Sequence, residues 1–422
     1  MFSALRIMLD RLIGHGTLAV TDAGGQQHLF GDGSAPRVAI RLLARATERA
    51  IALDPHLALG EAYMSGRLQM TEGGIADLLD LLLRETERNG LPRWTRGLEL
   101  ARRGLRRLAQ FNPAPRSRRN VAHHYDIDGS IYDLFLDADR QYSCAYFAPG
   151  SDLEHIDLEA AQLAKKRHIA AKLALKPGLR ILDIGSGWGG LALYLADVCA
   201  ADVTGITLSA EQLAVARNRA AERHFGSRVE FLLEDYRSLD REFDRIVSVG
   251  MFEHVGINHY ATYFSRIADL LADDGVALIH TIGRSDGPGY TNPFVARYIF
   301  PGGYSPALSE MLPAIERAGL IVADIEVLRL HYAETLKAWR QRFAAKRHRA
   351  VELKGEEFAR MWEFYLAGAE GAFRHQGLVV FQLQLVRSID ALPMTRGYMH
   401  TAEMQLERLE HNDPPPLRMA GE

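Results

Sequence analysis

From about residue 170 the sequence alternates short β-rich runs with amphipathic stretches of helical period. Helical spacing is seen in Leu191, Tyr194, Leu195 and Val198, and again over residues 209–224. This alternation predicts an α/β fold built on a doubly wound, mostly parallel sheet, in which ligands bind beyond the carboxyl ends of the strands. The predicted strands are RILDI (180–184), DVTGIT (202–207), VEFLL (229–233), RIVSV (245–249), VALIHTI (276–282) and VVFQLQLV (379–386).

A glycine-rich loop, DIGSGWGG (183–190), follows the first predicted strand and precedes a helix. Gly185 and Gly187 allow the backbone to turn tightly and approach a ligand, while the helix N-terminus favours a carboxylate. Such a loop alone is also compatible with NAD. The acidic residue directly before G-x-G-x-G resembles motif I of class I methyltransferases, which implies that S-adenosylmethionine is the cofactor.

In those enzymes the residue matching Asp183 positions the methionine amino group. The second predicted strand ends in Thr207 and Leu208 without the carboxylate that usually holds a ribose, so we expect Gln212 to contact the ribose hydroxyls. After the third strand, Asp235 offers a carboxylate for adenine N6 and Tyr236 an aromatic wall, with ordinary packing as the alternative for Tyr236. The expected cofactor residues here are Asp183, Gly185, Gly187, Thr207, Leu208, Gln212, Asp235 and Tyr236.

Four further segments carry a more specific resemblance. They are QYSCAYF (141–147), SVGMFEHVG (248–256), LIHTIG (278–283) and LHYAETL (330–336). Together with DIGSGWGG and GITLS they resemble the cyclopropane fatty acid synthase and mycolic acid cyclopropane synthase family, over residues 120–390. HHYDI (123–127) and LGEAYMSGRL (59–68) are similar to its full-length bacterial members. The resemblance implies transfer of a methylene group from S-adenosylmethionine to the cis double bond of an unsaturated phospholipid acyl chain.

This chemistry explains the residue types in those segments. An alkene is a weak nucleophile, so the sulfonium methyl must be held in line in a dry pocket, and a base must then deprotonate the new methyl group. In the family that base is a bound bicarbonate, held by positions matching Cys144, Glu253, His280 and Tyr332 and by the backbone at Ile282. Positions matching Tyr142 and Ser143 contact the cofactor.

Each of these residues also has a simpler structural explanation. Cys144 could be a small buried residue, His280 a core histidine and Glu253 a helix cap. Their joint occurrence, at the carboxyl ends of the fourth and fifth predicted strands with the cofactor loop after the first, favours the functional interpretation. Glu253 and His254 are not a zinc motif because no second histidine follows at helical spacing, and the two cysteines lack metal-ligand or disulfide spacing. We therefore expect no metal.

The length of 422 residues predicts two domains. We expect a small N-terminal α+β domain over residues 1–110 that faces lipid, a linker over 111–120, a methyltransferase domain over 121–400 and a C-terminal tail over 401–422. Turn signals lie at Gly24-Gly25 and at 31–33, and residues 75–88 are predicted to be helical. A first helix, with apolar residues from Phe2 to Ile13 at helical spacing, is expected to face the core, with a membrane-surface helix as the alternative.

Residues 93–119 contain nine arginines and one carboxylate, Glu99. This excess indicates either contact with anionic phospholipid or a solvated helical face, whereas nucleic acid is not expected because no aromatic stacking motif accompanies it. The sequence has no uncharged run long enough to span a bilayer, so any membrane association is expected to be peripheral. A cytoplasmic, inner-membrane-associated protein is expected, and the family resemblance implies a homodimer.

An aromatic segment, YTNPFVARYIFPGGYSP (290–306), is expected to form a lid or acyl-chain tunnel, with core packing as the alternative for Phe294 and Phe300. The helix-rich stretch 334–373 would complete this cover. Three rival functions stay open at this point. They are an acyl-chain methyltransferase giving a methyl-branched, methylene or furan-precursor product, a non-catalytic lipid-binding protein, and a small-molecule N- or O-methyltransferase.

Overall fold

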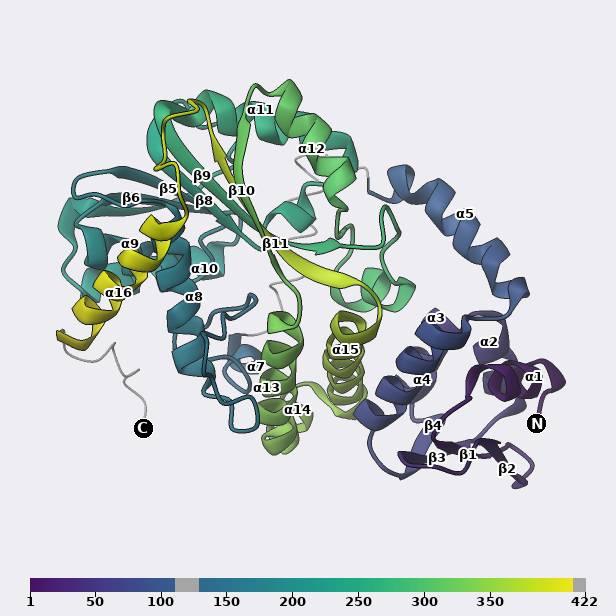
Figure 1. Cartoon of the computed structure of the whole chain (residues 1–422). Helices are drawn as coiled ribbons and strands as arrows, with labels where there is room; N and C mark the ends of the chain where they lie inside the picture. The colour runs from purple at the N-terminus through teal and green to yellow at the C-terminus, as the bar shows by residue number, and fades with distance from the viewer. Residues whose placement is uncertain (111–128, 413–422) are drawn as a thin grey trace. The chain divides into compact units, whose positions relative to one another are not determined.

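The computed structural model describes residues 1–110 and 129–412, which form two compact units (Figure 1). The first unit contains Met1–Ala109, Gly289–Pro301 and Tyr332–Leu378, and the second contains Gln110–Pro288, Gly302–His331 and Val379–Glu422. Residues 289–301 and 332–378, which the sequence placed in the methyltransferase domain, thus cluster with the N-terminal segment. The expected linker 111–120 and the HHYDI segment lie outside the described residues.

The second unit is built on a seven-stranded sheet with the order β10-β11-β9-β8-β5-β6-β7. Its strands β5 to β9 pair in parallel, and β10 pairs antiparallel with β11. The predicted fold class is confirmed, and every predicted run is a strand. The strands are β5 (Arg180–Ile184), β6 (Asp202–Thr207), β7 (Val229–Leu233), β8 (Phe243–Val249), β9 (Leu271–Arg284), β10 (Ile321–Leu328) and β11 (Leu378–Val386).

Helices cover both faces of this sheet (Figure 1). On one face α11 (Tyr260–Leu270) and α12 (Leu308–Arg317) contribute to the core, and on the other α8 (Leu158–Lys172), α9 (Gly190–Cys199), α10 (Ala210–Glu222) and α16 (Gly397–Asn412) do so. The unit also contains the short helix α7 (Gly129–Tyr132). Asp157 caps α8, accepting from the Ala160 N–H at 3.0 Å, and Ser209 caps α10.

The expected C-terminal tail is partly wrong. Residues 397–412 form α16, which packs on α8, and Arg167 of α8 contacts Glu407 at 2.8 Å and Glu410 at 2.5 Å. These ion pairs join charged residues of two separate helices, so the charged residues near the C-terminus form part of a helix interface. Residues 413–422 lie outside the described part of the chain.

The first unit contains a four-stranded sheet of order β2-β1-β3-β4. Leu5, Leu9 and Leu12 of the first helix are buried, so its expected core-facing orientation is confirmed. The elements are α1 (Ser3–Leu12), β1 (Thr17–Thr21), β2 (Gln27–Gly31), β3 (Arg37–Leu42), α2 (Arg45–Leu53), α3 (Pro55–Met64), β4 (Leu68–Glu72), α4 (Ile75–Asn89), α5 (Arg93–Ala109), a π-helical turn (Val295–Ile299), α13 (His331–Ala345), α14 (Arg347–Lys354) and α15 (Glu356–His375).

Phe294, from the aromatic segment, belongs to the hydrophobic core of the first unit. Its ring centroid lies 4.8 Å from that of Phe364 on α15. A Cβ at Gly60 of α3 would lie 2.4 Å from the Phe294 ring, so the absence of a side chain at Gly60 permits this packing. The core-packing alternative therefore holds for Phe294.

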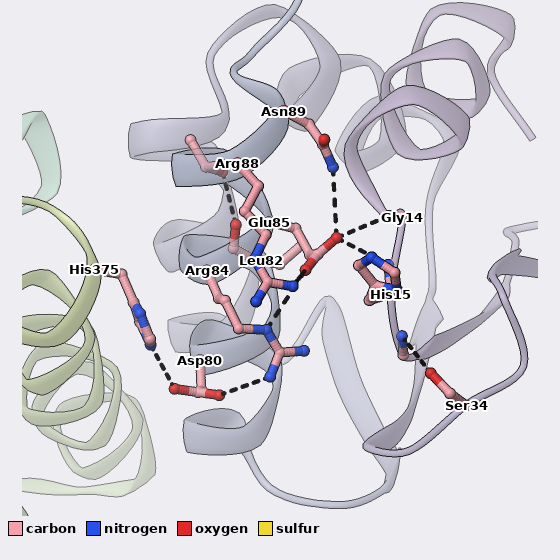
Figure 2. A network of polar contacts seen from close by, with 12 residues as sticks. Gly14, His15, Ser34, Asp80, Leu82, Arg84, Glu85, Arg88, Asn89 and His375 are labelled. Atoms are coloured by element: carbon pink, nitrogen blue, oxygen red, sulfur yellow. Dashed lines mark hydrogen bonds and ion pairs between the residues drawn. The ribbon is translucent and has the colours of Figure 1, made fainter.

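A buried carboxylate, Glu85 of α4, ties the end of α1 to α4 (Figure 2). Its Oε2 accepts hydrogen bonds from the N–H groups of Gly14 and His15, each at 2.9 Å. Burial alone would raise the pKa of Glu85, but these donors, with Arg84 and Arg88, hold the pKa below its ordinary value. The network stabilises the charged form of Glu85 inside the first unit.

None of the helices in the described part of the chain is long and apolar enough to cross a membrane.

Candidate active site

A pocket with about 750 Å³ of empty space, partly open to solvent, lies at the carboxyl ends of β5, β6, β7 and β8. Seven of the predicted cofactor residues line it. Among the other lining residues, sequence reasoning missed Arg237, Met251 and His254, which follow the third and fourth predicted strands. The predicted residues in the lining are Gly185, Gly187, Thr207, Leu208, Gln212, Asp235 and Tyr236.

The glycine loop adopts backbone conformations that require glycine. Gly185 and Gly187 have φ angles of 83° and 55°, in the left-handed region. The N–H groups of Gly185 and Ser186 both donate to the carbonyl of Ile206 at 2.9 Å, which anchors the loop to β6. A Cβ at Gly187 would meet no atom within 4 Å, so this position leaves room for a ligand.

Asp183 is buried at the end of β5, directly before the loop. Its Oδ2 atom has no hydrogen-bond partner among the described residues. Burial raises the pKa of Asp183 to about 7, although the charge of Lys165 acts in the opposite direction. A buried carboxyl group with an unused oxygen fits an ammonium group, such as that of a bound methionine moiety.

On the β6 side of the pocket, two side chains orient each other. The Thr207 hydroxyl donates to Oε1 of Gln212 at 2.8 Å, so the amide NH₂ of Gln212 remains the donor for a ligand. Asp235 is held by its neighbour Arg237, whose Nε and Nη2 lie 2.8 and 2.6 Å from its two carboxylate oxygens. This ion pair fixes the orientation of the Asp235 carboxylate at the pocket wall.

Tyr142, Ser143 and Cys144 lie in a segment outside the helices and strands that a buried lysine anchors. Lys165 of α8 donates to Ser143 Oγ at 2.9 Å and to Gln141 Oε1 at 2.5 Å. Burial lowers the pKa of Lys165 to about 8. Lys165 was missed from the sequence, where it is one of two adjacent lysines outside any recognised motif.

The side chains of this segment are also positioned by neighbours. The ring of Tyr142 meets that of Tyr132 edge to face at 5.2 Å between centroids. The buried Cys144 thiol donates to the carbonyl of Ala145 at 3.2 Å. Gln162 donates to the carbonyl of Ser143 at 3.0 Å, so both the backbone and the side chain of Ser143 are fixed.

Glu253 lies in the short turn Phe252–His254 after β8 and is buried. Its Oε1 accepts from the backbone N–H of Ile282 at 2.6 Å, while Oε2 has no partner within the described ranges. Burial raises the pKa of Glu253 to about 7. The resemblance implied that the Ile282 backbone holds an anion, but here the Ile282 N–H is bound to Glu253.

His280 lies on β9 opposite Val249 of β8, and its carbonyl accepts from the Gly250 N–H at 2.9 Å. Burial, assisted by the charges of Lys165 and Lys172, lowers the pKa of His280 to about 3. The ring is therefore neutral at physiological pH. His280 is 2% exposed, and within the described ranges it belongs to no cluster of side chains that could hold a metal ion.

Lys165 connects these residues electrostatically. Its charge acts on the carboxyl group of Asp183 and on His280, and Cys144 acts on Lys165 in turn. Asp183, Cys144 and His280 thus lie within the electrostatic range of one ammonium group. Tyr332 belongs to the first unit, where its ring packs against Trp339 and Phe373, and its expected place beside the other residues stays a prediction.

The strand order, the glycine loop and the pocket define a class I S-adenosylmethionine-dependent methyltransferase. Solved structures agree with this class. A cyclopropane synthase of Mycobacterium tuberculosis matches with a TM-score of 0.60 and 32% identity, covering 65% of this chain and 99% of that one. A mycolic acid cyclopropane synthase complexed with S-adenosylhomocysteine matches with the same values. Coclaurine N-methyltransferase, at 20% identity and a TM-score of 0.62, shares the fold.

Within this class, residues 113–383 match the family model described as mycolic acid cyclopropane synthetase. The cyclopropane-fatty-acyl-phospholipid synthase of Escherichia coli is 38% identical over 338 residues, covering 79% of this chain and 84% of the relative. Tuberculostearic acid methyltransferase of Mycobacterium tuberculosis is 34% identical over 388 residues, covering 85% and 87%. The chain belongs to the cyclopropane synthase family. Residues 8–89 match a separate domain family of unknown function.

Proposed function

We propose that the protein is a cyclopropane-fatty-acyl-phospholipid synthase, which converts the cis double bond of a phospholipid acyl chain to a cyclopropane ring. The observation that carries this proposal is the burial of Glu253, in the turn after β8, and of His280 on β9, the strand that pairs with β8. Burial of these groups indicates a site from which water is excluded, and a cationic intermediate must be kept from water. The E. coli relative bears the name of this activity.

We assign the pocket to S-adenosylmethionine. Asp183 would accept from the amino group of the methionine moiety, and Gly185 and Gly187 would admit it closely. Gln212 would donate to a ribose hydroxyl through its free NH₂, and Asp235 and Tyr236 would contact the adenine. Tyr142 and Ser143, anchored through Lys165, would close the methionine end of the site.

The proposed reaction has two steps, methyl transfer and ring closure. The π electrons of the alkene form a bond to the sulfonium methyl carbon, and the S–C bond breaks to leave S-adenosylhomocysteine and a carbocation. Loss of a proton from the new methyl group lets its C–H electron pair close the ring. The protein must hold the alkene in line with the methyl group and exclude water, because water would trap the cation.

The residue types present can hold an anion that acts as the base. His280 is neutral and can donate a hydrogen bond, as can the hydroxyl of Tyr332, while Glu253 has an unused buried oxygen. The Cys144 thiol can donate to the anion in place of its bond to the Ala145 carbonyl. We propose that these residues, with the Ile282 backbone, hold bicarbonate. Bicarbonate would supply the base for ring closure. The unused oxygen of Glu253 would accept a hydrogen bond from the hydroxyl of bicarbonate, and the Ile282 N–H would then be able to donate to the anion.

A second candidate is methylation of the acyl chain without ring closure. It is favoured by the names of two relatives, tuberculostearic acid methyltransferase and a probable fatty acid methyltransferase of Pseudomonas putida, which is 40% identical over 292 residues. The product would then be a methyl-branched, methylene or furan-precursor fatty acid. In this reaction the proton would be lost from a carbon other than the new methyl group, so that no ring forms.

Helix α5 supports peripheral binding to an anionic membrane. Trp94, Leu98 and Leu105 share one face of the helix by their spacing and are 43%, 39% and 58% exposed. The exposed Arg96 and Arg103 lie on the opposite face, at the spacing of a basic amphipathic helix. We propose that α5 inserts its apolar face among lipid headgroups, and that the protein acts on unsaturated phospholipids at the cytoplasmic surface of the inner membrane as a homodimer.

The function can be tested in a host that lacks cyclopropane lipids. The host would express the chain and receive methyl-labelled methionine, and its phospholipids would be analysed by mass spectrometry. The proposal expects labelled cyclopropane acyl chains with wild-type protein and none with Gly187→Arg, whose side chain would fill the methionine subsite. Labelled small molecules with unlabelled lipids would contradict it.

A further inference from the structure

Three buried side chains form a hydrogen-bonded row that ends on His280. Lys172, the last residue of α8, donates from Nζ to Oε1 of Gln382 on β11 at 2.7 Å. Nε2 of Gln382 lies 3.1 Å from Nδ1 of His280. Each of the three residues is at most 2% exposed, so solvent does not compete for these bonds.

The row fixes the orientation of the Gln382 amide. The ammonium group of Lys172 can only donate, so the group of Gln382 that faces it must be the carbonyl oxygen. The NH₂ group must then face His280. Exchanging the two ends of the amide would place NH₂ against an ammonium group and leave both sets of donors without an acceptor, which is costly in a buried site.

The same reasoning continues into the imidazole ring. An amide NH₂ group can only donate, so Nδ1 of His280 must accept and cannot carry a proton. In a neutral imidazole the proton then lies on Nε2. We propose that Lys172 and Gln382 are positioning residues that hold His280 in its Nε2–H form, so that Nε2 donates to the anion used in ring closure. This inference rests on the proposed function for the role of that anion.

The start of the row is itself held in place. Lys172 also forms an ion pair with Glu326 of β10, whose Oε2 accepts from His168 Nε2 at 2.6 Å. Burial lowers the pKa of Lys172, whereas Glu326 acts to raise it and so favours its charged form. Glu326, on a partly exposed strand, therefore stabilises the donor that sets the orientation of an amide and a histidine deeper in the unit.

The proton position can be read directly by ¹⁵N NMR of the full-length protein labelled at the histidine ring nitrogens. His280 signals would be identified by their loss in His280→Gln. The inference expects an unprotonated Nδ1 and a protonated Nε2 in the wild type. It expects Gln382→Glu to reverse them, because a carboxylate at this position accepts from both Lys172 and the imidazole.

Activity would be measured on the same variants. With the donor at Nε2 lost, kcat of Gln382→Glu should fall about 10²- to 10³-fold, while affinity for S-adenosylhomocysteine stays unchanged. If this variant does not fold, Gln382→Met should give a mixture of both tautomers and an intermediate kcat. The matched control is Gln384→Met, because Gln384 is buried on the same face of β11 and donates to the Lys172 carbonyl and to Tyr398 instead. It should keep the wild-type spectrum and kcat.

A proton on Nδ1 of wild-type His280, or a reversed tautomer with unchanged kcat, would overturn the inference. Failure of the proposed function looks different. In that case bicarbonate depletion would leave turnover unchanged and the lipids would lack the label, while the ¹⁵N spectrum could still show the Nε2–H form. Bicarbonate dependence with a proton on Nδ1 would overturn this inference alone.

Discussion

The backbone N–H of Ile282 donates to Oε1 of Glu253 at 2.6 Å, joining the end of β9 to the turn after β8. Oε2 of the same carboxyl group is buried without a partner in the described parts of the chain. Glu253 is thus held at one oxygen and unsatisfied at the other. In our account a bound anion would meet that second oxygen and compete for the Ile282 N–H, so the pair is a switchable contact within the proposed base site.

We therefore expect Glu253, His280 and Tyr332 to contribute jointly to one function, which is to hold the anion. Glu253→Gln, His280→Gln and Tyr332→Phe should each lower kcat by about 10²- to 10³-fold, because each removes a preorganised group that acts after cofactor binding. Double variants should lose much less than the product of the single losses. Depleting bicarbonate should slow the wild type, and adding it should restore the wild type but rescue the variants poorly. Loss of cofactor affinity alone would count against this assignment.

Cofactor affinity should depend on pH through Asp183. Its pKa is raised by burial to about 7, and only its charged form attracts the ammonium group of the ligand. Affinity for S-adenosylhomocysteine should therefore fall about tenfold for each pH unit below that pKa and level off above it. Calorimetry from pH 5.5 to 7.5 would measure this. Asp183→Asn should bind weakly with no such slope, whereas Glu253→Gln should retain it.

These site residues differ in how far the sequence could predict them. The glycine loop and Thr207, Gln212 and Asp235 follow strands whose ends are visible as local patterns, so their convergence follows from the sheet order. Lys172 and Gln382 are 210 positions apart, and no local pattern shows that they meet. Pairing of this kind depends on tertiary packing.

The fold shows the same division between local and long-range information. Strand β10 was missed because Asp324 and Glu326 interrupt its apolar pattern, and most of its residues are only partly buried. The membership of residues 332–378 in the first unit was missed as well. Their amphipathic helices show which faces are apolar, but do not show which core those faces join.

Membrane binding should depend on the two faces of α5. Replacing Arg96, Arg103 and Arg107 by Gln should weaken binding to anionic vesicles by roughly 3 kcal/mol, or about 10²-fold, at about 1 kcal/mol for each basic residue. Sedimentation with vesicles at low and high salt would measure it. A control with the exposed Arg6, Arg11 and Arg45 replaced carries the same change in net charge and should bind nearly as the wild type does. Equal loss in both variants would show that binding does not depend on α5.

The buried carboxylate of the first unit should matter for stability. Glu85→Gln should lower the free energy of unfolding by about 2 kcal/mol, because the N–H groups of Gly14 and His15 lose a charged acceptor. Urea denaturation would measure the loss, and hydrogen exchange at those two amides should accelerate. Glu87→Gln, at an exposed position on the same helix, should change stability by less than about 0.5 kcal/mol. Unchanged exchange at Gly14 and His15 would contradict the role given to Glu85.

The central claim is that the new methyl group loses a proton and closes a ring. The most direct test uses purified protein, liposomes of cis-unsaturated phospholipid and S-adenosylmethionine with a trideuterated methyl group. The account predicts acyl chains that retain two of the three deuterium atoms and that show, in the proton NMR spectrum of unlabelled product, the signals of a cyclopropane ring. A product that retains all three deuterium atoms and has no ring signals would contradict it.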